Sequence, residues 1–174
     1  MLMVEDLQFG YRNGPDVLKH INFSLEDGQC MAILGNNGAG KSTLLKCFNR
    51  ILPAKRGKVR MDGQNLLQMT SREIAKHVAF VSQTLPNAQM TVRDMVMLGR
   101  RPYMRWGFTE QDHRIVQDSM EQLRISHLQD RFLSQLSGGE RQKTVLARAL
   151  SQQPRMMLLD ESTSNLDCKT NIKS

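Results

Sequence analysis

Cysteine is scarce in this chain. Its 174 residues include three cysteines, Cys30, Cys47 and Cys168, and no C-x-x-C pair. An odd number of widely spaced cysteines argues against a disulfide framework and against a zinc site. We interpret the three as buried or incidental thiols.

Long apolar runs are absent as well. The longest run, residues 30–34, has five residues, far fewer than the roughly 20 that span a bilayer. The N-terminus lacks a basic region followed by an apolar stretch, so no secretory signal is indicated. We therefore expect a cytoplasmic protein with no direct transmembrane segment.

Aromatic and acidic residues are few. The chain has one Trp, two Tyr and six Phe, and its 24 Lys and Arg outnumber 17 Asp and Glu, which gives a net charge of +7. That balance favours contact with anions such as nucleotides, nucleic acid or a lipid surface. The basic residues are scattered and the aromatics form no stacking platform, so we expect no specific nucleic-acid partner.

The secondary structure expected from the sequence is mixed, in a chain whose length and 40% hydrophobic content suit one domain. Alternating apolar residues predict two N-terminal strands, and short apolar runs predict further strands at residues 30–34, 58–61, 77–81 and 156–159. A helix is expected from Ser42 to Leu52, before Pro53. Residues 70, 91, 109 and 137 are expected to start helices.

A glycine-rich motif follows the expected strand at residues 30–34. Residues 35–42 match G-x-x-x-x-G-K-[ST] and precede the expected helix, which is the context of a P-loop. Backbone N–H groups and the helix dipole would hold phosphates, Lys41 would contact the β- and γ-phosphates, and Ser42 would ligate Mg²⁺. The expected nucleotide-binding residues are Gly35, Asn36, Asn37, Gly38, Ala39, Gly40, Lys41, Ser42 and Thr43.

Two acids, Asp160 and Glu161, end the expected strand at residues 156–159. A metal–triphosphate site needs a carboxylate at this place, and Asp160 fits that role. Glu161 fits the general base that deprotonates or orients the attacking water. The fold class that follows is α/β, a P-loop NTPase with an N-terminal antiparallel β subdomain, a parallel core sheet and a helical subdomain at about residues 85–135.

The string from Leu136 to Gln142, L-S-G-G-E-R-Q, resembles the signature sequence of the ATP-binding cassette (ABC) family. The resemblance runs from Tyr11 to Asp167 and implies ATP and Mg²⁺ as cofactors. It implies that Tyr11 stacks on adenine and that Gln83 links Mg²⁺ and the attacking water to a membrane permease. It also implies a homodimer, in which the signature of one chain, Leu136, Ser137, Gly138, Gly139 and Glu140, contacts the ATP of its partner. The loop after the catalytic glutamate would be Ser164, Asn165, Leu166 and Asp167.

The branch of the family is suggested by residues 96–103 together with Glu140. These resemble ATPases of bacterial importers for iron–siderophore, haem or cobalamin complexes, which lie peripherally on the cytoplasmic face of the inner membrane. Residues of about 85–135 would then dock on permease subunits. Arg100 and Arg101 are candidate contacts, with solvated surface charge as the open alternative. The sequence does not identify the ligand.

Two features depart from the family pattern. Ser162 stands where the family has proline, and no histidine follows Asp160 and Glu161, so the switch histidine is missing. We therefore expect residues 1–174 to be a nucleotide-binding domain truncated at its C-terminus. The alternatives are a cassette that binds ATP without productive hydrolysis and a non-transport ABC ATPase acting on nucleic acid.

Overall fold

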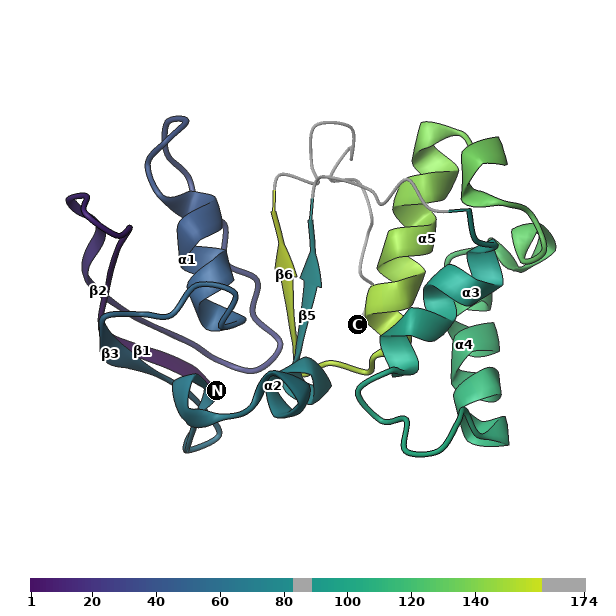
Figure 1. The fold of residues 1–174 in the computed structure, drawn as a ribbon, viewed down its shortest axis with the longest axis horizontal. Coiled ribbons are helices and arrows are strands. Elements are labelled where there is room, and N and C mark those ends of the chain that lie inside the picture. The colour runs from purple at the N-terminus through teal and green to yellow at the C-terminus, as the bar shows by residue number, and fades with distance from the viewer. Residues whose placement is uncertain (83–88, 161–174) are drawn as a thin grey trace. The chain divides into compact units, whose positions relative to one another are not determined.

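The computed structural model describes residues 1–82 and 89–160. It divides the chain into two units, Met1–Ala75 and Lys76–Ser174, and each unit is described by itself. Among the described residues, the first unit holds an antiparallel sheet and helix α1, and the second holds a parallel strand pair and helices α3, α4 and α5 (Figure 1).

The sheet of the first unit has the strand order β2-β1-β3-β4. Its strands are β1 (Leu2–Gly10), β2 (Asp16–Leu25), β3 (Arg56–Met61) and β4 (Gln64–Asn65), and all neighbours are antiparallel. Within β1, Val4 pairs with Phe23 but Leu7 pairs with Ile21, so β1 carries one extra residue there, a bulge. The bulge contains Asp6, whose φ is 47°. The apolar residues on both sides of the bulge are buried although it breaks their alternation: Leu2, Val4, Leu7 and Phe9.

Helix α1 (Lys41–Phe48) covers part of this sheet, with Phe48 packed edge-on against Phe23 of β2. It ends four residues before the expected end at Leu52. Asn49 caps the helix, and Arg50 then adopts a left-handed conformation with φ of 51°, a common way to end a helix. The helices η1 (Leu66–Gln68) and α2 (Ser71–His77) follow β4.

The strand expected at residues 30–34 is wrong. These residues form no strand, and Leu34 is 90% exposed. An apolar run forms a central strand only when strands flank it and take up its backbone hydrogen bonds. Among the described residues, no strand pairs with residues 30–34.

The second unit contains β5 (Val78–Val81) and β6 (Met156–Leu159), which pair in parallel as expected. It also contains the α-helices α3 (Val92–Met97), α4 (Glu110–Gln122) and α5 (Gly138–Ser151). Each starts where the sequence predicts a helix start and begins with a capping box, at Thr91, Thr109 and Ser137 respectively. Short helices η2 (Leu98–Arg100), η3 (Ser126–Leu128) and η4 (Leu133–Gln135) connect them.

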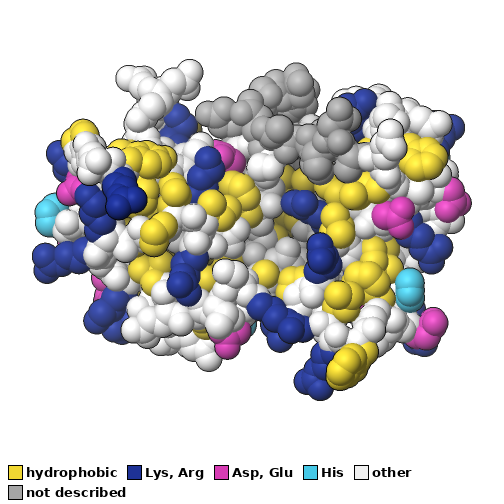
Figure 2. Space-filling view, viewed as in Figure 1, with side chains coloured by type: hydrophobic (Ala, Val, Ile, Leu, Met, Phe, Trp, Pro, Cys, Tyr) yellow, Lys and Arg dark blue, Asp and Glu magenta, His cyan; other side chains and the backbone are white. Residues whose placement is uncertain are grey.

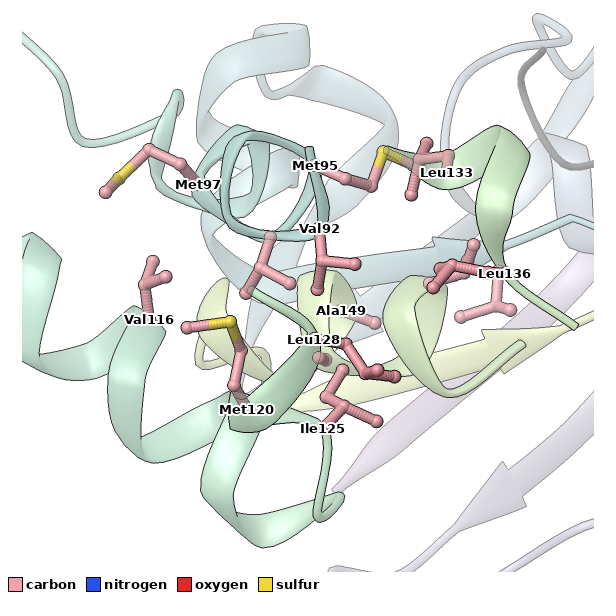
Figure 3. Packing of buried hydrophobic residues seen from close by; sticks show 14 of the residues in the cluster. Val92, Met95, Met97, Val116, Met120, Ile125, Leu128, Leu133, Leu136 and Ala149 are labelled. Carbon is pink, nitrogen blue, oxygen red and sulfur yellow. The ribbon is translucent and has the colours of Figure 1, made fainter. Parts of the chain in front are cut away.

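The three helices enclose the core of the second unit (Figure 3). Met95 of α3, Met120 of α4 and Val145 of α5 all contribute to it, and the first two are fully buried. Gly99 lets η2 approach α5, because a Cβ there would overlap the Arg148 carbonyl and the Ser151 hydroxyl. In the described parts of the chain, no helix combines the length and apolarity needed to cross a membrane.

The two described cysteines carry free thiols, as expected. Cys47 is buried within α1, and burial raises the pKa of its thiol to about 11. Cys30 is exposed, and Cys168 lies outside the described residues.

Candidate nucleotide-binding site

The expected P-loop joins residues 30–34 to α1 in the first unit. Gly38 and Gly40 have φ values of 85° and 94°, in the left-handed region that glycine enters at little cost. Gly40 is also the N-cap of α1, and a Cβ on it would lie 3.0 Å from Val17 Cγ1 and 3.2 Å from Leu18 Cδ2. Both the backbone conformation and the contact with β2 therefore require glycine at position 40.

Lys41 closes this loop on itself. Its ammonium group donates hydrogen bonds to the carbonyl oxygens of Gly35, at 2.8 Å, and Asn36, at 3.0 Å. The carbonyl of Gly40 accepts the first helical hydrogen bond, from Leu44 N at 2.9 Å. These two hydrogen bonds hold the positive charge of Lys41 at the loop that precedes α1.

The first turn of α1 suits an anion. It contains no acidic residue, and no side chain caps the N-terminus of the helix. The dipole and the N–H groups of such a turn favour negative charge, especially beside a lysine. Lys41 and Ser42, which the sequence predicts as phosphate and Mg²⁺ contacts, lie in this turn and are partly exposed. The residues present therefore fit a magnesium–triphosphate group.

Tyr11 follows β1 and is 51% exposed, as an aromatic available to stack on a base needs to be. Its ring lies edge-on to Phe9, with centroids 5.0 Å apart, and its hydroxyl lies 3.3 Å from Thr43 Oγ1. The sequence predicts Tyr11 and Thr43 as nucleotide contacts, and the first unit brings them together. Val17, which lies against Gly40, was not predicted, and no motif marks it.

The predicted signature residues form the start of α5 in the second unit. Ser137 caps the helix, and Gly138 and Gly139 are exposed, with open space where a Cβ would stand. Leu136 is buried in the core of Figure 3 and anchors this end of the helix.

The carboxylate of Glu140 serves this cap. It accepts hydrogen bonds from Ser137 N at 2.8 Å and Ser137 Oγ at 2.7 Å, and these bonds hold the pKa of Glu140 below its usual value. Glu140 therefore shapes the cap with its carboxylate turned back on Ser137. The S-x-x-E spacing of a capping box is the sequence signal for this role.

Asp160 is the acidic member of the prediction that lies within the described residues, in the second unit. Asp160 follows β6 directly, and its N–H donates to the Val81 carbonyl at 3.0 Å, which continues the pairing with β5. Gln83, Glu161 and the loop Ser164, Asn165, Leu166 and Asp167 lie outside the described residues. Their predicted roles stay predictions.

Arg100 is predicted as a permease contact or a solvated surface charge, and both roles need an exposed side chain. The structure contradicts both, because Arg100 is buried. It is 5% exposed, and its guanidinium donates to Asp112 Oδ1 at 2.8 Å and to the Ser151 carbonyl at 2.9 Å. The burial follows from these partners, because a buried charge persists only when it is paired and hydrogen-bonded. Arg101 is exposed.

Comparison with known proteins gives the same family throughout the chain. The family described as ABC transporter matches residues 18–164. An uncharacterized ABC transporter ATP-binding protein of Methanocaldococcus jannaschii is 41% identical over 99% of this chain and 68% of its own length. A petrobactin import ATP-binding protein of Bacillus subtilis is 33% identical over 92% and 64% of the two chains. A phosphonates import ATP-binding protein of a Ruegeria strain is 36% identical over 98% and 70%.

Among solved structures, an inward-facing transporter described as of the metal-chelate type shares 32% identity with this chain, with a TM-score of 0.79. The match covers 95% of this chain and 61% of that one. The chain thus spans about two thirds of the length of the curated relatives it matches. Together with the P-loop before α1 and the capped Ser-Gly-Gly start of α5, these matches show that the chain belongs to the family of ABC transporter ATP-binding subunits.

Proposed function

We propose that this protein binds and hydrolyses ATP to energise import of an iron–siderophore or related metal chelate through a membrane permease. The single observation that carries the nucleotide site is the first turn of α1. It joins a glycine-dependent loop, a lysine bound to that loop and a helix start without acidic residues. A triphosphate is the ligand class that such a turn holds best.

Ser42, Asp160 and Gln83 are proposed to hold Mg²⁺, and Gln83 lies outside the described residues. Their oxygen-bearing side chains are of the type that this ion prefers. When bound, Mg²⁺ neutralises the charge that develops on the phosphates. Lys41 contributes a fixed positive charge at the β- and γ-phosphates, and the loop glycines contribute N–H donors.

Hydrolysis is assigned to Glu161. In this step the oxygen of a water molecule attacks the γ-phosphorus, and the bond between the γ-phosphorus and the β–γ bridging oxygen breaks. A proton of the water passes to the Glu161 carboxylate. ADP leaves with the bridging oxygen, and phosphate leaves with the water oxygen. A general base of this kind contributes about 10²- to 10⁴-fold to the rate.

The active unit is proposed to be a homodimer. The start of α5 is proposed as the element that contacts the partner's ATP, because Gly138 and Gly139 are exposed and belong to a 14-residue helix that begins there. The signature of one copy would bind the γ-phosphate held by the P-loop of the other. Light scattering tests this: Glu161→Gln is expected to double in mass when ATP is added, and Glu161→Gln with Ser137→Ala is not. An unchanged mass in Glu161→Gln contradicts the dimer.

A metal chelate is the proposed cargo because the petrobactin relative and the metal-chelate transporter match nearly the whole chain. The phosphonate relative favours a phosphonate as the cargo instead. Uptake of a radiolabelled ferric siderophore and of a labelled phosphonate, in cells that carry either the natural protein or Lys41→Ala, separates the two. Loss of ferric siderophore uptake alone supports the proposal, and loss of phosphonate uptake alone replaces it.

The helical segment of about residues 85–135 is proposed to dock on the permease. The protein would then lie on the cytoplasmic face of the inner membrane. Within the segment, Arg101 and Trp106 are exposed, and Trp106 is fully so. Lys and Arg side chains are otherwise spread over the visible faces of both units rather than gathered in one patch (Figure 2). Arg101→Glu is expected to weaken the complex with the permease and to leave ATP binding unchanged.

A further inference from the structure

A hydrogen bond in the first unit connects the expected base-stacking ring to the phosphate-binding helix. Tyr11 OH and Thr43 Oγ1 are 3.3 Å apart, and either hydroxyl can donate. Tyr11 comes from the end of β1, and Thr43 lies in the first turn of α1, 32 residues further along the chain. The contact therefore joins two elements that are far apart in the sequence.

The two hydroxyls stand in different surroundings. Thr43 is 8% exposed and is fixed among the buried residues of α1. Tyr11 is 51% exposed, and its ring is otherwise supported by the edge-on contact with Phe9, with an interplanar angle of 85°. Phe9 thus supports one side of the ring, and Thr43 fixes the far end of the side chain.

A half-exposed tyrosine with no such bond would keep several side-chain rotamers, and binding a base would have to immobilise it. Immobilising a flexible side chain on binding lowers affinity by roughly two- to tenfold. A ring held in place before the ligand arrives avoids that loss.

We propose that Thr43 is a positioning residue for the nucleobase: its hydroxyl holds Tyr11 as a preformed stacking platform and so couples base recognition to the phosphate loop. The inference rests on the proposed nucleotide binding at this loop. It predicts that the Tyr11 hydroxyl, which need not touch the base, contributes to affinity for ATP but not for inorganic triphosphate, which has no base.

The test compares equilibrium binding of ATP and of inorganic triphosphate, with Mg²⁺, to the natural chain and to Tyr11→Phe. The variant keeps the ring and loses the hydroxyl. We expect its affinity for ATP to fall about three- to tenfold, the range for one hydrogen bond, and its affinity for triphosphate to stay unchanged. Tyr103→Phe is the matched control, because the Tyr103 hydroxyl also has a hydrogen bond, to the Gln152 carbonyl at 3.0 Å, but in the second unit.

Thr43 completes a double-mutant cycle. Thr43→Val removes the hydroxyl at nearly constant volume, and Thr43→Ser keeps it. Tyr11→Phe combined with Thr43→Val is expected to bind ATP no more weakly than Thr43→Val alone, and Thr43→Ser to retain near-natural ATP affinity. Additive losses in the cycle, an unchanged ATP affinity in Tyr11→Phe, or an equal loss in Tyr103→Phe would overturn the proposal. If the natural chain binds neither ATP nor triphosphate, the proposed function fails instead.

Discussion

Arg100 Nε donates a hydrogen bond to Asp112 Oδ1 over 2.8 Å, and both side chains are buried. The other carboxylate oxygen of Asp112 accepts the N–H and the hydroxyl of Thr109, at 2.9 and 2.8 Å. Arg100 also lies 4.0 Å from the centre of the Tyr103 ring. The ion pair therefore joins η2 to the start of α4, and the hydrogen bond from Arg100 to the Ser151 carbonyl adds the end of α5.

Removing one partner of this pair is expected to destabilise the protein strongly. Asp112→Ala leaves the Arg100 charge buried without its carboxylate, a change that typically lowers the free energy of unfolding by about 3–5 kcal/mol. Urea denaturation measures it, with Asp118→Ala as the control, because Asp118 is an exposed acid of the same helix. Equal midpoints for the two variants would contradict the account.

The same pair predicts a dependence of stability on pH. Burial alone would raise the pKa of Asp112, but the hydrogen bonds from Thr109 and Arg100 outweigh it and hold this pKa below its usual value. A carboxyl whose pKa is lower when folded stabilises the protein above its unfolded pKa, near 3.9. That contribution is lost as the pH falls through the folded pKa, and acid denaturation should show the loss in the natural chain but not in Asp112→Asn.

Glu140 offers a second titration, at the start of α5. Since hydrogen bonds from Ser137 lower its pKa, Ser137→Ala is expected to return this pKa toward the ordinary value for glutamate. A ¹³C NMR titration of the Glu140 carboxyl measures it directly. An identical titration in the natural chain and in Ser137→Ala would show that the cap is absent in solution.

The P-loop prediction concerns Gly40, and Gly28, which lies outside the loop and also has a left-handed backbone, is its control. Gly40 and Gly28 have φ values of 94° and 78°, but only Gly40 has neighbours within 4 Å of its would-be Cβ. Gly40→Ala and Gly28→Ala are both expected to lower the free energy of unfolding, by about 1 kcal/mol or more for the backbone strain. Only Gly40→Ala should lose ATP affinity, by at least about tenfold. Equal ATP affinities, measured by calorimetry, would remove Gly40 from the site.

Trp106 is the single tryptophan of the chain and is fully exposed. Its fluorescence is expected to resemble that of free tryptophan, with full access to acrylamide. Binding of the permease to the surrounding segment should shift the emission to shorter wavelength and reduce quenching. Emission at short wavelength in the isolated protein would show that Trp106 is covered without a partner.

Local signals in the sequence predict most elements of this fold. The capping boxes at Thr91, Thr109 and Ser137 start helices as expected, because their hydrogen bonds form within four residues. The expected antiparallel sheet and the parallel pair β5 and β6 are also present. Gly38 and Gly40 of the expected P-loop have left-handed backbones, with φ values of 85° and 94°.

The differences arise where distant residues decide the outcome. The Arg100-Arg101 pair has the pattern of surface charge, but Asp112 and Ser151, 12 and 51 residues further along, draw Arg100 inside. The apolar run at residues 30–34 has the composition of a central strand but, in the described structure, no strand beside it. Neither burial nor pairing is encoded within a short window of sequence.

The most direct test of the central claim is ATP turnover by the natural protein and by Glu161→Gln, with equilibrium ATP binding measured on the same samples. We predict steady phosphate release by the natural protein, a fall of about 10²- to 10⁴-fold in kcat for the variant, and ATP affinity retained in both. Equal turnover would remove Glu161 from the mechanism. Stoichiometric ATP binding without turnover in the natural protein would contradict an ATPase and leave a cassette that only binds nucleotide.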